Sequence, residues 1–583
     1  MRQIGKMALK VTDRSGFHPA HSNRWTMKVG TLMPILVDQI IPNTTINLRE
    51  AIMAKLPPLA SDTFMSLQLK VEAFFVPYRL LYGGFENWLM ETPLRTADGT
   101  PYKLRCPKLA IRPVDVTNAG PGSLFDMLGY RSSGPGDPGA EYVSYTNIFP
   151  WLAYARIWDD WYRNTRIQAP LFVQPGNYPG EDTGRSYNYY SVANLPFISL
   201  TDRTVDAGGA QSNVFSGVRT VVGNSQQTGY LADGSFITDL RQRNFGMDYF
   251  TSAQPSAQRG DMRSVRMSVS GNVVEVMNTA GDESSVFDAS DPITTSFTIA
   301  ALRGENSLQI FAERNNFSYR MEDYNMINYG AHLKRGMATR AMFLGQHVVD
   351  VLTRTISQSQ FSSDQQSASS QNPFESVGAQ YGNAMAAGND TLVSNFTTDE
   401  HGILMVLASL VPRVTYNTGT ERYLFDFVNE GCQVDFANAI LQNVGNEPIF
   451  MAELVGGIGG VDSAGNVDPG LVFGYTDRYA HWMDKNDQIH GLLKDGQSLQ
   501  SFALQRSFDD TVNLNGDFLQ IPTTYLDQAA AVSVGAAGFN AWCEAFFDYR
   551  KIQPLHEYSI PSLQDPAYEH GRTVVFNKNG NSI

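Results

Sequence analysis

Histidine and acidic pairs are the residues of this sequence whose types and spacing could do chemistry. His18 and His21 have the spacing of two zinc ligands, but Pro19 separates them and the nearest acid is Asp13. Three acidic pairs stand in polar stretches, where solvation or helix capping explains them more simply than acid–base catalysis: Asp159-Asp160, Asp282-Glu283 and Asp509-Asp510. Such carboxylates could also bind divalent cations between subunits. We predict no catalytic residue, no metal site and no cofactor.

Sequence motifs of the common enzyme classes are missing. The chain has no HExxH or GxSxG sequence, and Gly456–Gly460 is not followed by the Gly-Lys-Ser/Thr of a phosphate loop. The cysteines Cys106, Cys432 and Cys543 lie far apart, so we predict buried thiols made in a reducing cytoplasm. Because no apolar run reaches about 18 residues and no signal sequence is evident, we expect neither a membrane span nor secretion.

Composition favours a β-rich chain with extensive contacts. Charged residues make up 17% of the 583 residues and aromatic residues 11%, and the 50 glycines and 28 prolines suit many short strands joined by turns. Low charge with many aromatic residues is typical of a subunit that buries its outside against neighbours. A large monomeric β-rich protein remains an alternative.

A basic N-terminal arm stands out against the net charge of −14. Residues 1–26 are expected to be irregular. Such an arm could bind phosphates without reading a nucleotide sequence; an alternative is a disordered terminus that is basic by chance. The candidate nucleic-acid-binding residues are Arg2, Lys6, Lys10, Arg14, Arg24 and Lys28.

Strand and helix patterns follow the arm. Residues 67–75 alternate apolar and polar side chains until Pro77, which predicts a strand. A first strand region is expected over residues 27–41 and a short helix over 47–55. Residues 78–88 are rich in aromatic side chains and are expected to be buried against another surface. The candidate packing residues are Tyr82, Phe85 and Trp88.

The clearest helix is predicted to begin near Asn147, with Pro150 in its first turn. One face is almost wholly aromatic, which is more typical of packing, in the subunit core or between subunits, than of a cofactor site. The residues of this face are Trp151, Tyr154, Trp158, Trp161 and Tyr162.

Later segments are mostly strand-like. Residues 265–276 predict a β-hairpin, residues 297–315 a helix, and residues 357–372 a polar low-complexity linker or loop. Further strands are predicted over 403–411, 423–428, 471–475, 499–504 and 542–549.

Several of these segments resemble the major capsid protein of the Microviridae, particularly the gokushovirus-like single-stranded DNA phages. Two departures limit the likeness: Pro255-Ser-Ala replaces an aromatic spacer, and residues 315–320 replace a Gly-rich arginine run. The segments that carry it, in the family's order, are residues 25–35, 41–45, 67–90, 149–164, 248–260, 301–303, 313–314 and 547–561.

The resemblance implies a fold and a function. The fold is an eight-stranded antiparallel jelly roll of the viral capsid type, with long inserted loops and a few short helices. It implies self-assembly into an icosahedral T=1 shell that packages single-stranded DNA, built in the host bacterial cytoplasm and located in the virion. Implied partners are copies of the chain, the packaged DNA, a small basic DNA-binding protein, an internal scaffolding protein, a DNA pilot protein and a host surface receptor.

The chain divides, on this interpretation, into segments around an outward-facing insertion. The insertion, residues 175–292, is a candidate protrusion that meets the host, and simple surface variation is the alternative. Its candidate receptor contacts are Tyr187, Tyr189, Tyr190 and Tyr230. The other segments are the arm 1–26, the first part of the core 27–174, a helix-containing core segment 293–356, the polar loop 357–400, and the remaining core with its tail 401–583.

A second hypothesis comes from another class of protein. The abundance of tryptophan and tyrosine would also suit a large monomeric β-rich protein that binds or cleaves carbohydrate. Assembly state separates the two, since a capsid subunit associates with copies of itself and a carbohydrate-active monomer does not.

Overall fold

The structure is a computed structural model. It describes part of the chain, and everything below concerns that part. The described residues are 14–61, 63–82, 85–91, 94–95, 101–102, 108–111, 121–129, 144–171, 214–216, 239–256, 267–270, 273–276, 321–331, 339–357, 380–417, 419–424, 446–455, 471–477, 479–508, 510–529 and 539–555.

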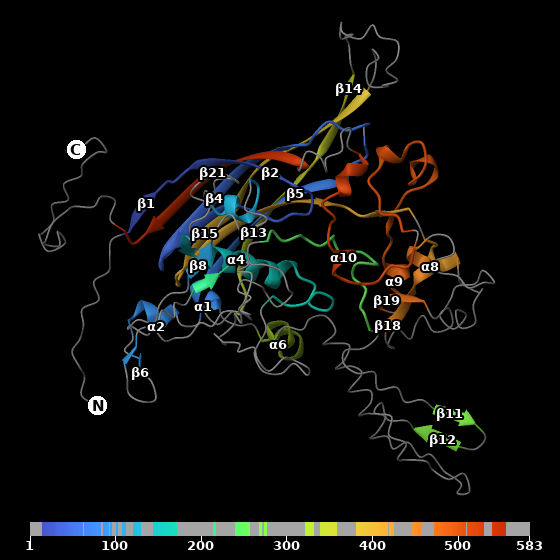
Figure 1. Cartoon of the computed structure of the whole chain (residues 1–583), viewed down its shortest axis with the longest axis horizontal. Helices are drawn as coiled ribbons and strands as arrows, with labels where there is room; N and C mark the ends of the chain where they lie inside the picture. The colour runs from blue at the N-terminus through green and yellow to red at the C-terminus, as the bar shows by residue number, and fades with distance from the viewer. Residues whose placement is uncertain are drawn as a thin grey trace, which may run out of the picture.

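Two antiparallel sheets form the centre of a mainly β fold (Figure 1). The six-stranded sheet has the order β1-β21-β4-β15-β14, and β2 also pairs with β21. The four-stranded sheet has the order β13-β5-β16-β3. Their strands are β1 (Ser15–Phe17), β2 (His21–Met27), β3 (Met33–Ile40), β4 (Thr44–Lys55), β5 (Leu67–Pro77), β13 (Met342–Asp350), β14 (Leu352–Ser357), β15 (Gln380–Thr398), β16 (Gly402–Pro412) and β21 (Ala541–Gln553).

A hydrophobic core joins the two sheets. Strand β4 buries every second residue, and its inward side chains share one apolar cluster with those of β5 and β16. Because side chains alternate along a strand, one face of each sheet supplies this core. The cluster includes Ile46, Leu48, Ile52, Ala54, Leu69, Val71, Ala73, Phe75, Leu404, Val406, Ala408 and Leu410.

A second core lies on the other side of the four-stranded sheet. There Phe74, Val76 and Met405 pack against the helices α1 (Tyr78–Leu81) and α4 (Phe149–Ile157). Figure 1 shows both helices on the side of the molecule away from β21 and β4. Strand β16 is therefore buried on both faces, which explains why its sequence is nearly all apolar.

Shorter elements surround these layers. Between β5 and β13 in the chain they are α2 (Phe85–Leu89), β6 (Leu94–Arg95), β7 (Pro101–Tyr102), β8 (Lys108–Ile111), α3 (Leu124–Met127), β9 (Ser144–Asn147), the π-helix η3 (Trp158–Tyr162), β10 (Val214–Ser216), β11 (Met267–Ser270), β12 (Val273–Val276) and α6 (Met321–Tyr329). Towards the C-terminal half they are β17 (Thr415–Tyr416), η6 (Arg422–Leu424), β18 (Asn446–Phe450), α8 (Met451–Leu454), β19 (Val472–Asp477), α9 (Ala480–Met483), β20 (Asp487–Gln488), η8 (Gly491–Leu493), η9 (Gln500–Phe502), α10 (Gly516–Leu519) and η10 (Tyr525–Gln528).

Many of the predicted elements are confirmed. The strands expected over 67–75, 403–411, 471–475 and 542–549 correspond to β5, β16, β19 and β21, and the hairpin to β11 and β12. In the first strand region, Gly30 takes a positive φ of 73° and β3 begins after it. Pro34 lies within β3, which is tolerated because β3 is an edge strand.

Other predicted elements are wrong. Residues 47–55 form strand β4 rather than a helix, because they pair with β15 and β21 on both sides, and their burial alternates with period two. The arm is not irregular throughout, because β1 and β2 pair with β21. Residues 500–502 and 422–424 are 3-10 turns rather than strands, and residues 425–428 lie outside the described part. Residues 297–315 and 358–372 lie outside it as well.

Candidate functional site

The aromatic helix predicted from the sequence corresponds to α4 and η3, residues 149–162. Asn147 Oδ1 accepts a hydrogen bond from the Phe149 backbone N–H at 3.0 Å, and Pro150 follows in the first turn. From Trp158 the helix widens into a π-turn that ends at Tyr162. This segment packs against the four-stranded sheet as part of the second core.

Tyr154 fixes this helix to backbone groups. Its hydroxyl donates to the Leu32 carbonyl at 2.9 Å and accepts from the Arg241 N–H at 2.8 Å. Burial raises the pKa of this phenol above its ordinary value, so the hydroxyl keeps its proton. The helix is thereby tied to the residues before β3 and to the segment that returns at residue 239.

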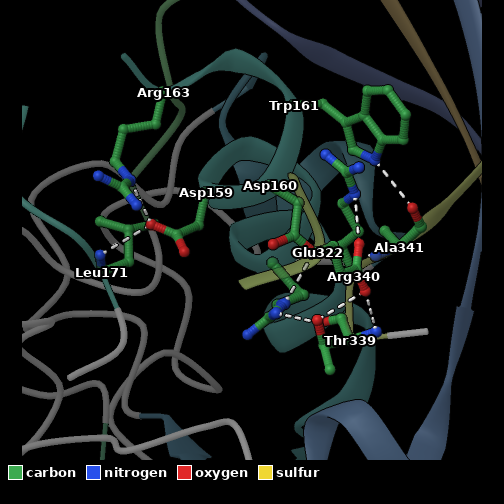
Figure 2. A network of polar contacts seen from close by, with 10 residues as sticks. Asp159, Asp160, Trp161, Arg163, Leu171, Glu322, Thr339, Arg340 and Ala341 are labelled. Atoms are coloured by element: carbon green, nitrogen blue, oxygen red, sulfur yellow. Dashed lines mark hydrogen bonds and ion pairs between the residues drawn. The ribbon is translucent and has the colours of Figure 1, made fainter. Parts of the chain in front are cut away.

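The acidic pair Asp159-Asp160 holds structure together rather than a metal (Figure 2). Asp159 accepts from Arg163 at 2.7 Å and from the Leu171 N–H at 3.1 Å. Asp160 accepts from Arg156 at 2.8 Å and from the Ala341 N–H at 2.9 Å. Both carboxylates are buried and satisfied by cations and backbone donors, which is the arrangement that makes burial of a charge tolerable.

A neighbouring network binds α6 and the start of β13 to the same helix. Trp161 Nε1 donates to the Ala341 carbonyl at 2.9 Å, and Arg340 lies over the indole ring at 5.5 Å. Arg340 also pairs with Glu322 at 2.7 Å, and Glu322 accepts from Thr339 (Figure 2). These contacts hold Trp161 in place although its side chain is 41% exposed.

A buried ionic network joins the helix to the sheet. The Tyr162 hydroxyl donates to Glu72 of β5, and Arg243 pairs with the same carboxylate and stacks on the Tyr162 ring at 5.0 Å. Arg243 also donates to Ser409 of β16 at 3.1 Å. Burial and the Glu72 charge raise the pKa of Tyr162 well above its ordinary value. The network therefore ties the end of the helix to β5 and, through Arg243, to β16.

The predicted packing residues mostly lie inside the subunit. Tyr82, Trp151, Tyr154, Trp158 and Tyr162 are buried in the second core. Phe85 and Trp88 are half-buried, with their rings 5.8 Å apart, and Trp161 is the exposed member of the set. Of these residues, only Trp161, Phe85 and Trp88 have side-chain surface with which another subunit could make contact.

The predicted nucleic-acid-binding residues are only partly placed. Arg14 donates to Thr45 Oγ1 at 2.7 Å, Arg24 pairs with Glu544 at 2.7 Å, and Lys28 is exposed. Arg2, Lys6 and Lys10 lie outside the described residues. The receptor candidates Tyr187, Tyr189, Tyr190 and Tyr230 lie outside them too.

The two histidines of the arm do not converge on one position. His18 Nε2 contacts Asp548 at 2.6 Å, whereas His21 Nδ1 contacts the Pro19 carbonyl at 3.0 Å. Among the residues that the structure describes, no group of three or more His, Cys, Asp or Glu side chains could hold a metal ion. Within the same residues, no helix has the length and apolar character needed to cross a membrane.

Cys543 is a buried thiol, as predicted. Burial raises its pKa to about 12, so the reactive thiolate is not populated at neutral pH. Cys106 and Cys432 lie outside the described residues.

Sequence reasoning missed the solvent face of the six-stranded sheet. Strand β21 exposes Trp542, Phe546 and Ile552 while its alternate residues are buried. The alternation of side chains along residues 541–553 was the sequence signal for this face. That alternation predicts a strand, but it does not show that the exposed rings form a surface with neighbouring strands.

Comparison with known proteins decides the family. A model of the family described as "Capsid protein (F protein)" matches residues 6–563. The chain belongs to this capsid protein family. It is 24% identical to Capsid protein VP1 of Chlamydia phage 1, over 94% of this chain and 96% of the relative.

Two further relatives of the capsid family agree. Capsid protein VP1 of Bdellovibrio phage phiMH2K is 22% identical and that of Spiroplasma virus 4 is 21% identical, each over 94% of this chain and at least 95% of the relative. The resemblance to Microviridae capsid proteins is therefore confirmed, as is the prediction of a major capsid protein of a small single-stranded DNA phage, located in the virion.

Proposed function

We propose that this capsid protein folds as an eight-stranded jelly roll whose copies close into an icosahedral T=1 shell around single-stranded DNA. The strand order supports this fold. If β2, β3, β4, β5, β13, β15, β16 and β21 are numbered one to eight, the first pairs with the eighth, the second with the seventh, and the fourth with the fifth. The third pairs with the sixth.

This pairing is that of one long antiparallel hairpin wound into two sheets. One sheet then holds strands one, eight, three and six, and the other strands two, seven, four and five. Two Greek keys of this kind make the jelly roll of viral capsid and lectin domains. The extra strands β1 and β14 extend the first sheet. This strand order is the observation that carries the proposal.

Assembly is a matter of contact rather than catalysis. We propose that an apolar end surface, made of Tyr423, Leu424, Trp482 and Met483, is buried between copies of the chain. Tyr423 and Leu424 line a cavity of about 300 Å³, and Trp482 and Met483 follow its lining residue His481 on α9. All four side chains are exposed in the single chain. Exposed apolar groups that gather in this way mark association surfaces.

The experiment is electron microscopy of the purified full-length chain and of Trp482→Ala. The proposal predicts closed shells of one diameter for the native chain and fewer or no shells for Trp482→Ala. Met247→Ala, which truncates another exposed side chain, is the control that should assemble normally. A native chain that stays a 64.5 kDa monomer at every ionic strength would contradict the shell proposal.

Genome packaging is the second part of the proposal, with the basic arm turned inwards. Deleting residues 1–13 removes Arg2, Lys6 and Lys10 but keeps Arg14, which is bonded to Thr45. Shells of this variant should form and contain less DNA, as measured by the absorbance ratio at 260 and 280 nm. Unchanged DNA content would show that the arm has no role in packaging.

Host attachment is proposed for the insertion at residues 175–292. Replacing Tyr187, Tyr189, Tyr190 and Tyr230 with serine should reduce adsorption of phage to host cells while shells still form. Normal adsorption would favour surface variation without a receptor role. A small basic DNA-binding protein, an internal scaffolding protein and a DNA pilot protein complete the set of proposed partners.

A further inference from the structure

We propose that the solvent face of the six-stranded sheet, across β2, β21 and β4, is a binding surface for single-stranded DNA. The inference rests on the proposed function, because it names the surface that a packaged genome would contact. This DNA-binding face is defined by the outward residues Ser22, Arg24, Thr26, Thr45, Asn47, Arg49, Ala51, Met53, Lys55, Trp542, Glu544, Phe546, Asp548, Arg550 and Ile552.

Two aromatic rings stand on this face. Trp542 is 42% exposed and Phe546 is 49% exposed, although they flank the buried residues Cys543 and Ala545. They are four residues apart on one strand, which corresponds to about 13 Å. Two rings open to solvent at this separation can each stack on a base of one extended strand, and stacking does not depend on which base it is.

The neighbouring strands leave these rings accessible. Ser22 and Ala51 lie on either side of Phe546 in register, and both side chains are too small to cover it. Phe539 packs edge-on against Trp542 with ring centroids 6.0 Å apart, which limits the motion of the indole. The rings are thus exposed on a rigid sheet, which reduces the entropy cost of binding.

Cations flank the rings. Lys55 lies beside Trp542 in register, and Arg49 lies beside Asp548. Among the described residues neither cation has an ion-pair partner within 4.0 Å, so both are available for phosphates. Arg24 and Arg550 are exposed and paired with Glu544 and Asp548, so the face carries four cations and two acids.

This excess of positive charge contrasts with the rest of the molecule. The whole chain has a net charge of −14. A positive surface with aromatic rings on an otherwise acidic protein is complementary to a nucleic acid strand, and a surface of the acidic subunit itself is a poorer match. We therefore assign DNA, rather than a second copy of the chain, as the ligand of this face.

A hollow at the Trp542 end supplies a place for a nucleotide. Its volume is about 630 Å³, and Pro121, Gly122, Asp126 and Met127 are among the residues that line it. The strand residues that line it include Arg24, Thr26, Met53, Lys55, Trp542 and Glu544. It combines a ring for stacking, cations for phosphate and the two carboxylates of Glu544 and Asp126, which can accept hydrogen bonds from a base amino group.

The arm reaches the same sheet. Arg14 donates to the Thr45 hydroxyl and to the Ile552 carbonyl, and β1 then pairs with the end of β21. Residues 1–13, which carry Arg2, Lys6 and Lys10, are therefore joined to the chain at the edge of the DNA-binding face.

The test measures binding of a fluorescein-labelled dT16 oligonucleotide to the unassembled full-length chain by fluorescence anisotropy at several salt concentrations. Trp542→Ala and Phe546→Ala should each weaken binding at least about fivefold. Arg49→Gln with Lys55→Gln should weaken binding and reduce the slope of log K against log salt by about 0.7 for each phosphate that is no longer neutralised. Phe64→Ala, which truncates an exposed aromatic side chain outside the DNA-binding face and outside the proposed subunit contact, should bind like the native chain.

The outcomes separate this inference from the proposed function. Native affinity in Trp542→Ala and Phe546→Ala, with a native salt slope in Arg49→Gln/Lys55→Gln, would overturn the assignment of DNA to this face. If Trp542→Ala and Phe546→Ala form no shells but bind the oligonucleotide like the native chain, the face is an interface between copies. That result also overturns the assignment of DNA to this face. Failure of the native chain to form any shell would count against the proposed function alone.

Discussion

A buried carboxyl group in the core makes stability depend on pH. Glu50 of β4 has its side chain fully buried and faces His347 of β13, with Oε1 2.9 Å from Nδ1. Its Oε2 atom has no hydrogen-bond partner among the described residues. Burial raises the pKa of Glu50 from an ordinary value of 4.5 to about 7; His347 opposes this rise and Asp390 adds to it.

The sign of the effect follows from proton binding. Because the folded chain holds the Glu50 proton more tightly than the unfolded chain, this residue stabilises the fold fully below about pH 4.5. The stabilisation is lost progressively as the pH rises to about 7. A rise of this size in the pKa corresponds to about 3 kcal/mol of unfolding free energy.

Glu50→Gln removes the titration and keeps a group that can bond to His347. We expect the variant to gain about 3 kcal/mol over the native chain between pH 4.5 and pH 8. The assay is urea unfolding of the unassembled chain, followed by tryptophan fluorescence at both pH values. Glu86→Gln, on exposed α2, is the control and should leave the pH dependence unchanged. Equal differences between Glu50→Gln and the native chain at both pH values would refute the assignment of this pH dependence to Glu50.

Two further predictions concern the supports of the aromatic helix. Tyr154→Phe removes the hydroxyl that bonds to the Leu32 carbonyl and the Arg241 N–H, so the unfolding free energy should fall by about 2 kcal/mol. A decrease no larger than that of Tyr423→Phe, which truncates an exposed tyrosine, would contradict this prediction. Arg243→Leu leaves the Glu72 charge buried without its cation and should cost about 3–5 kcal/mol. The control is Arg413→Leu, which breaks the exposed pair of Arg413 with Asp487 and should lower the unfolding free energy by no more than about 1 kcal/mol. Similar decreases in unfolding free energy for both arginine variants would argue against the buried network.

The sequence predicted those elements whose burial left a simple pattern. Strand β5 alternates apolar and polar residues over its first half, and β16 is nearly all apolar because the two cores cover both its faces. The helix predicted over residues 47–55 is wrong because the charged and apolar residues of that stretch, from Arg49 to Lys55, suit a helix as well as a strand. Pairing of β4 with β15 and β21, distant in sequence, decides the outcome.

The candidate surfaces were harder to predict. The aromatic period of residues 151–162 indicated packing correctly, but not that Trp161 alone would face solvent. The pairs of Asp159 with Arg163 and of Asp160 with Arg156 have the i,i+4 spacing of a helix. The contacts of Asp160 with Ala341 and of Glu72 with Arg243 join residues 181 and 171 apart, and no local pattern encodes them. The exposed rings of β21 become a surface only when β2 and β4, from the other end of the chain, flank them.

The most direct test of a DNA-lined shell built from this fold is a cryo-electron microscopy reconstruction of particles assembled from the full-length chain with single-stranded DNA. We predict a closed icosahedral shell in which each subunit shows the two sheets described above, with DNA density against Trp542 and Phe546. Particles without closed symmetry, or only single chains of 64.5 kDa, would contradict this prediction.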